Sequence, residues 1–257
     1  MSTEIQSIHR AATILQLLCG RSRRLGVAEL AGEIGLSKGT VHGILRTLHT
    51  VGFVEQDRES RKYQLGASLL HMGATYLERN ELRSRGLKSA AALAALSGQS
   101  VQIGTLHEEH VLIVHHVSLP DDGRQAREVG SLVPSHATAL GKALLSHHQH
   151  LACEHAQHGL AACTPATVTD IDQLQAELQE ISEQGWASEI DELCRGIASI
   201  ASPIEDHLRN IIGAIAISGP TDRLCANGLP RSDLVPFVMQ AARAISSALG
   251  AMPGRYG

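Results

Sequence analysis

Hydrophobic positions between residues 26 and 66 recur at a spacing that predicts two short helices joined by a tight turn. The inward face of the first helix is formed by Val27, Leu30 and Ile34. The inward face of the second helix is formed by Val41, Leu45 and Leu48. Both series repeat every three to four residues, as one face of an α-helix requires. Gly35 separates the helices, and Ser37 stands where its hydroxyl can cap the second one.

The outward face of the second predicted helix is small, polar and basic. Such a helix, held by a neighbouring helix, fits the major groove of DNA. We expect DNA contacts from this region through Ser37, Lys38, Gly39, Thr40, His42, Gly43 and Arg46. The two glycines cost helix stability, about 1 kcal/mol each. Close approach of the helix backbone to DNA is one candidate reason for them.

A charged hairpin is predicted directly after the second helix. Residues 52–56 and 62–65 read as strands, and the turn between them spans residues 57–61. The side chains expected to reach phosphates are Arg58, Arg61 and Lys62 in this wing and Arg21 in an earlier basic loop. The alternative is a surface hairpin whose charges are merely solvated. The order helix, turn, helix and basic wing favours DNA binding.

The rest of the chain predicts an α+β fold with a separate second domain. Ser7 is expected to cap a first helix, and residues 67–82 form a helical linker. Further helices are predicted at residues 82–97, 137–146, 170–184 and 232–249. Strands are predicted at residues 101–106, 111–117, 186–190, 197–204 and 211–218. Strands paired by hairpins with helices between them indicate an antiparallel sheet with flanking helices. The expected domains are 1–66, the linker 67–82 and 83–250, with a tail at 251–257.

Charge is distributed unevenly along the 257 residues. The chain up to Arg85 carries a net charge of +4, and the remainder carries −8. This asymmetry suits a DNA-binding domain attached to a domain that does not touch DNA. The five cysteines show no CxxC spacing, so they indicate reduced thiols in the cytoplasm. No apolar run approaches the roughly 20 residues that a membrane-spanning helix needs.

Catalytic and metal-binding patterns give no competing signal. The histidine-rich run consists of His147, His148, His150, His155 and His158, and no pair in it has the i, i+4 spacing of two ligands on one helix turn. GxSxG, GxGxxG and Walker A patterns do not occur. We expect no cofactor, no metal and no catalytic residue. The favoured hypothesis is a ligand-responsive transcription factor, and the alternative is a small-molecule or metal-binding protein or enzyme with a vestigial DNA-binding domain.

The chain resembles the IclR family of bacterial transcriptional regulators. In the first part, the resemblance rests on Glu29-Leu30-Ala31, Gly35-Leu36-Ser37-Lys38, Leu45-Arg46-Thr47-Leu48, Gly52-Phe53-Val54 and Tyr63-Gln64-Leu65-Gly66. In the second part, it rests on the run from His136 to Leu145, on Gly185-Trp186 and on the run from Ile215 to Pro220. Relatives often carry Ser and Arg where this chain has Gly39 and Gly43, which leaves the operator sequence open.

The resemblance implies a GAF-like second domain that binds a small polar effector and assembles homodimers or dimers of dimers. Carried over by position, the effector-binding residues are Leu87, Gly104, Thr105, Leu106, Glu189, Ser199, Ala216 and Ser218. The alternative for these positions is ordinary strand packing. Residues 39–46 and 112–117 look most like the branch that regulates glycerol operons, so glycerol or its phosphate is the expected effector. Repression is the commoner habit among relatives, and double-stranded operator DNA is the expected partner.

Overall fold

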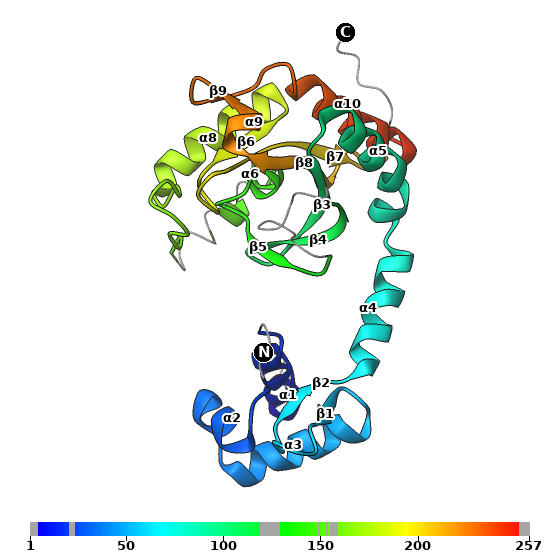
Figure 1. Ribbon diagram of the computed structural model, residues 1–257, viewed down its shortest axis with the longest axis vertical. Helices are drawn as coiled ribbons and strands as arrows, with labels where there is room; N and C mark the ends of the chain where they lie inside the picture. Colours follow the sequence, from blue (N-terminus) through cyan, green and yellow to red (C-terminus); the bar gives the residue numbers. More distant parts are fainter. Residues whose placement is uncertain are drawn as a thin grey trace. The chain divides into compact units, whose positions relative to one another are not determined.

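The computed structural model describes residues 5–20, 24–118, 129–148, 150–152, 154 and 159–251 (Figure 1). The chain forms two compact units, Met1–Arg79 and Asn80–Gly257. The predicted α+β fold is confirmed. The first unit holds a winged helix-turn-helix, and the second unit holds an antiparallel sheet with helices.

The described residues of the first unit form four helices and one hairpin. Its elements are α1 Gln6–Leu18, α2 Val27–Ile34, α3 Lys38–Thr50, β1 Val54–Gln56, β2 Tyr63–Leu65 and α4 Ala67–Arg79. The core contains the predicted inward residues Leu30, Val41, Leu45 and Leu48, together with Ile14, Val54 and Tyr63. Gly35 adopts a left-handed φ of 65° and ends α2, and the Ser37 hydroxyl accepts the Thr40 backbone N–H at 3.2 Å. The helix-turn-helix prediction is therefore confirmed.

Two predictions about helix ends were wrong. Ser7 does not cap α1, because the backbone N–H groups of Ile8 and His9 already bond to the carbonyl of Ile5 and place Ser7 inside the first turn. The linker is not one continuous helix to residue 82. Asn80 leaves helical geometry, and its side chain accepts the Arg83 backbone N–H at 2.8 Å to cap a new helix.

A six-stranded antiparallel sheet organises the second unit. The strands are β3 Ser100–His107, β4 His110–Val117, β5 Leu132–Pro134, β6 Ala187–Ile190, β7 Ile197–Glu205 and β8 Ile211–Pro220. Their order across the sheet is β5-β4-β3-β8-β7-β6. Two smaller features follow β8, the short helix α9 Thr221–Leu224 and the hairpin of β9 Cys225–Ala226 and β10 Leu229–Pro230. The sequence patterns predicted neither β5 nor this hairpin.

Helices cover both faces of the sheet (Figure 1). One face carries α5 Glu81–Ser97 and α10 Val235–Ala248, and the other carries α6 Ala139–Leu145, against which α8 Ile171–Gln184 packs. Neighbouring residues of β3 show the two sides, because Ile103 lies against Gly86 of α5 whereas Gly104 lies against Leu140 of α6. The space between the sheet and α6 is where the second unit can hold a ligand.

Candidate functional site

The residues of α3 that we expect to contact DNA are mostly exposed. Lys38, His42 and Arg46 are exposed, whereas the apolar residues at the core positions of the helix are buried. Within the described residues, neither Lys38 nor Arg46 takes part in an ion pair, so both charges are free for an outside partner. The hydroxyls of Ser37 and Thr40 lie 2.9 Å apart and bond to each other at the start of the helix.

The two glycines of α3 have no structural requirement inside the domain. A Cβ atom at Gly43 would meet nothing within 4 Å, and one at Gly39 would lie 3.9 Å from the Ser37 hydroxyl, an ordinary contact. Neither residue adopts the left-handed conformation that favours glycine. The packing of the domain would therefore accept a side chain at both positions, and glycine leaves the surface of α3 flatter there.

The basic residues of the wing differ in whether they form an ion pair. Arg58 and Arg61 are exposed near the tip of the hairpin, and Arg61 has a left-handed φ of 58°. Lys62 instead pairs with Glu29 of α2, with 3.1 Å between Nζ and Oε1. A phosphate contact from Lys62 must compete with this exposed pair. Arg21 lies outside the described residues.

Arg24 fastens the segment before α2 to the wing, which the sequence patterns did not reveal. Its guanidinium donates to the Asp57 carboxylate at 3.1 Å and to the Gln64 side-chain oxygen at 2.9 Å. Hydrogen bonds from the Ser60 hydroxyl and backbone hold the pKa of Asp57 below its ordinary value, and Arg24 adds to this effect. These contacts fix the position of the wing relative to the segment that leads into α2.

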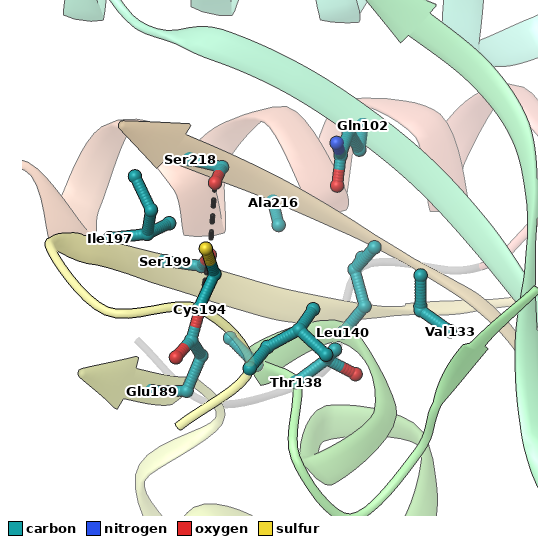
Figure 2. A pocket seen from close by; sticks show the side chains of 12 residues that line it. Gln102, Val133, Thr138, Leu140, Glu189, Cys194, Ile197, Ser199, Ala216 and Ser218 are labelled. Atoms are coloured by element: carbon teal, nitrogen blue, oxygen red, sulfur yellow. Dashed lines mark hydrogen bonds between the residues drawn. The ribbon is translucent and has the colours of Figure 1, made fainter. Parts of the chain in front are cut away.

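A pocket lies between the sheet and α6 in the second unit (Figure 2). Its volume is about 30 Å³. Its lining residues are Gln102, Val133, Thr138, Ala139, Leu140, Glu189, Leu193, Cys194, Ile197, Ser199, Ala216 and Ser218. One end is polar, because Glu189, Ser199 and Ser218 meet there, and the Val133 and Leu140 side is apolar. A small pocket of mixed polarity is suited to a small polar ligand.

The structure brings four of the eight predicted effector residues into this pocket and leaves four outside its lining. The four inside are Glu189, Ser199, Ala216 and Ser218. Leu87 is 37% exposed on α5, and Leu106 packs against the core. Gly104 lies against Val111 and Leu140, and the Thr105 hydroxyl donates to the Ile212 carbonyl at 2.8 Å. The outer half of β3 thus serves packing and strand bonding.

Several lining residues were missed because their elements are distant in sequence. Gln102 lies in the predicted strand 101–106, but two residues before the part of it that was expected to contact the effector, and Cys194 comes from the loop after β6. Thr138 carried a usable signal, since threonine before a helix is a typical cap, and its hydroxyl accepts the Gly141 backbone N–H at 3.1 Å. The remaining positions had no local pattern that marked them.

Glu189 is an unusual carboxyl for the interior of a domain. It is 2% exposed, and the described residues provide no ion pair for it. The Ser199 hydroxyl donates to its Oε1 at 3.0 Å, and the Glu192 backbone N–H donates to its Oε2 at 3.2 Å. Burial raises the pKa of Glu189 to about 7, although the Ser199 hydrogen bond opposes this change. Its charge therefore changes near neutral pH.

A buried ion cluster lies next to the pocket, because it is centred on Lys142 of α6, two residues after the lining residue Leu140. Lys142 is 1% exposed, and its Nζ lies 2.6 Å from Glu192 and 2.7 Å from Glu177. Burial raises the pKa of Glu192, and the charge of Lys142 counteracts this effect. With both partners present, the cluster joins α6 to α8 and to the loop after β6.

Metal binding and membrane insertion receive no support from the described part of the chain. It contains no group of three or more His, Cys, Asp or Glu residues that could hold a metal ion. Of the histidine-rich run, His155 and His158 lie outside the described residues. Among the helices described, none is long and apolar enough to cross a membrane.

The first unit is a winged helix-turn-helix with free basic residues, and the second is an α+β unit with a small polar pocket. Together they define a DNA-binding regulator that responds to a ligand. Family comparisons agree with this class. Residues 7–58 match the IclR helix-turn-helix domain, and residues 74–247 match the bacterial transcriptional regulator IclR C-terminal domain. The chain belongs to the IclR family of bacterial transcriptional regulators.

Individual relatives match the chain over nearly its whole length. It is 48% identical over 256 residues to the glycerol operon regulatory protein of Streptomyces coelicolor, with 100% of both chains covered. It is 44% identical to the glycerol operon regulatory protein of Streptomyces griseus, again with 100% of both chains covered. The crystal structure of an IclR transcriptional regulator from Alicyclobacillus acidocaldarius is similar, with a TM-score of 0.79, 26% identity and coverage of 96% of this chain and 98% of that one.

Proposed function

We propose that the protein represses a catabolic operon for a small metabolite, and that glycerol or glycerol phosphate releases it from the operator. The observation that carries this proposal is the 48% identity, over both full chains, to a glycerol operon regulatory protein. A pocket with hydroxyl and carboxyl groups at one end supports a polar effector of few atoms. Effector binding would shift the population between conformations that bind and do not bind DNA.

DNA reading is assigned to residues 1–66, connection to 67–82 and effector binding to 83–250. The proposed base-edge and close backbone contacts come from Ser37, Lys38, Gly39, Thr40, His42, Gly43 and Arg46. The proposed phosphate contacts come from Arg21, Arg58, Arg61 and Lys62. Support comes from the exposure of the α3 face and from the absence of ion pairs at Lys38 and Arg46 within the described residues.

We propose that the working form is a homodimer, alone or paired into a dimer of dimers, in which α4 helices of two copies pack together. No residue of α4 is buried in the single chain. Leu70 is 77% exposed and Tyr76 is 51% exposed on this helix, and Met72 is exposed as well. Apolar side chains at this density are covered by a partner in most soluble proteins. A symmetric dimer also presents two recognition helices to two half-sites.

The test is a fluorescence anisotropy titration of the full chain on DNA from its own upstream region, at stated salt. It is run with and without glycerol, glycerol 3-phosphate and a panel of small organic acids. Lys38→Ala and Arg46→Ala should each weaken specific binding by about tenfold. The matched control is Lys88→Ala, which removes the same charge from an exposed position of α5 in the second unit.

The possible results separate the parts of the proposal. Specific binding released by glycerol or its phosphate supports both the operator and the effector. Specific binding released only by an organic acid would remove the proposed effector and keep the regulator. Equal binding by the Arg46→Ala variant and the Lys88→Ala control would contradict the docking of α3.

A further inference from the structure

Strand β6 lies at one edge of the six-stranded sheet and leaves part of its backbone unpaired. Asp191, directly after β6, donates its backbone N–H to the Ile197 carbonyl at 2.8 Å. Because alternate residues of an antiparallel strand bond to the same neighbour, Glu189 also bonds to β7. The N–H and C=O groups of Ser188 and Ile190 therefore point away from the sheet. Within the described part of the chain, no other segment donates to them or accepts from them.

A groove lies between this open edge and α8, and its volume is about 310 Å³. Figure 1 shows α8 beside β6 at this end of the sheet. The α8 side chains that line the groove share one face of the helix and are Gln173, Glu177, Glu180, Ile181 and Gln184. Ser188 and Ile190 line the opposite side and are half-buried. Ligand sites commonly have volumes of about 300–1,000 Å³, so the groove has room for part of another molecule.

The lining of the groove carries an excess of negative charge. Its acidic residues are Glu177, Glu180, Glu189 and Glu192, and Lys142 is the one basic residue in the lining described. Lys142 is already engaged by Glu177 and Glu192. Glu180 is exposed and forms no hydrogen bond or ion pair with the residues that the structure describes. The groove therefore favours a partner with positive charge.

The same charge makes a second copy of the chain a poor occupant of this edge. Pairing β6 with β6 of another copy would bring two α8 helices to one junction. Helix α8 contains four acidic residues and no lysine or arginine, so the two helices would repel each other. An extended segment with basic side chains has no such conflict.

The spacing of α8 also suits an extended segment. Residues two apart in a strand lie on the same face, about 7 Å from each other. Glu177 and Glu180 are three residues apart on α8, which places their Cβ atoms about 5–6 Å from each other. Two basic side chains at alternate positions of an added strand can therefore face these two carboxylates.

We propose that the groove between β6 and α8 binds an extended, basic segment of a partner protein as an additional strand of the sheet. The backbone of the segment pairs with Ser188 and Ile190, and its alternate lysine or arginine side chains face Glu177 and Glu180. In strand addition, main-chain hydrogen bonds supply affinity and the alternate side chains supply selectivity. The inference does not depend on the proposed effector, because it uses the edge of the sheet and not the space between the sheet and α6.

The probe is a fluorescein-labelled, capped hexapeptide of alternating valine and lysine, titrated against the full chain by fluorescence anisotropy at stated salt. A peptide of alternating valine and glutamate keeps the strand pattern and reverses the charge. Two further lysine peptides carry N-methyl groups, on the valines in one and on the lysines in the other. Both keep every charge, and one of them blocks the N–H groups that would face β6. We expect the lysine peptide to bind, the glutamate peptide to fail, and one N-methyl peptide to bind at least tenfold more weakly.

The variant Ser188→Pro tests the backbone edge, since it removes one outward N–H and leaves the bonds of β6 to β7 in place. Proline is tolerated on edge strands. The matched control is Leu132→Pro on β5, the strand at the opposite edge. The Ser131 carbonyl accepts the Ile113 backbone N–H at 3.0 Å, so the next N–H, that of Leu132, points outward. Ser188→Pro should weaken binding of the lysine peptide about tenfold, and Leu132→Pro should leave it unchanged.

The variant Glu180→Gln tests the charge of the groove and keeps the size of the side chain. Its matched control is Glu183→Gln, the same change at an exposed position of α8 outside the lining of the groove. Glu180→Gln should weaken binding of the lysine peptide about threefold, as the loss of one exposed ion pair predicts. Glu183→Gln should bind it as the wild type does.

Each other outcome overturns the inference at an identifiable point. Unweakened binding by both N-methyl peptides would show that no strand is added, and this result decides the question even if Ser188→Pro fails to fold. Equal binding of the lysine and glutamate peptides would remove the role of charge. Absence of binding by every peptide would refute the proposed occupant, and a smaller mass of Ser188→Pro by light scattering would then assign the edge to a second copy of the chain.

Discussion

Replacing the two glycines of α3 by alanine should stabilise the protein and weaken its binding to DNA. Gly43 lies in the interior of the 13-residue α3, where glycine costs about 1 kcal/mol relative to alanine, and Gly39 is the second residue of the same helix. A methyl group meets nothing within 4 Å at Gly43 and makes an ordinary 3.9 Å contact at Gly39. The double substitution should therefore raise the free energy of unfolding of the first unit by about 1 to 2 kcal/mol.

The DNA prediction has the opposite sign because the two positions face outward in the free protein. If their Cα atoms approach base edges or thymine methyl groups, two added methyl groups must push the helix away from the groove. A loss of about 1.4 kcal/mol, a tenfold weaker affinity, is the expected minimum. Urea denaturation measures the stability, and anisotropy on operator DNA at fixed salt measures the affinity.

Gly32→Ala is the matched control for both measurements. Gly32 lies in α2, and a Cβ atom there also meets nothing within 4 Å. It should give a similar gain in stability with unchanged DNA affinity. A stabilised double variant that binds DNA as tightly as the wild type would refute close approach at Gly39 and Gly43. A double variant without added stability would refute the argument that these glycines are costly in the free domain.

Three further predictions concern the second unit and the linker. Lys142→Ala should destabilise the second unit by about 3–5 kcal/mol in urea denaturation, because two glutamates lose their cation; a cost below about 1 kcal/mol would contradict this. The folded-state pKa of Glu189 is raised from 4.5 to about 7, so the folded protein binds more protons across this window. The free energy of unfolding should therefore fall between pH 4.5 and pH 7, by about 3 kcal/mol at most, and a Glu189→Gln variant with the same pH profile as the wild type would exclude this group as the cause. Leu70→Glu combined with Tyr76→Glu should give a smaller species by light scattering, and an unchanged mass would place the proposed dimer contact elsewhere.

The recognition unit could be predicted from sequence because its signals are local. Val41, Leu45 and Leu48 repeat within one helix, and the buried core contains all three. The hairpin of β9 and β10 also had a local signal that was overlooked. Asn227 and Gly228 both have positive φ values, 54° and 76°, which is what a two-residue hairpin turn requires. A strand of two residues is too short to show alternation, so only the turn could have revealed it.

The pocket could be predicted only in part because it is assembled from distant segments. Thr138, Glu189 and Ser218 come from three different elements, and their meeting depends on the order of strands in the sheet. Local periodicity contains no information about this order. The burial of Lys142 could not be predicted either, because a lysine in a helix is normally exposed. Its two partners are 35 and 50 residues away in sequence.

Glu189 and Glu192 are three residues apart and both are buried, yet their surroundings give them different roles. Lys142 lies 2.6 Å from Glu192, so that carboxylate can remain charged as part of the structure. Glu189 has hydroxyl and backbone donors instead, and it faces the cavity. A buried carboxyl without a cation is costly for the fold. Glu192 offsets this cost with the charge of Lys142, whereas Glu189 has only neutral donors among the described residues.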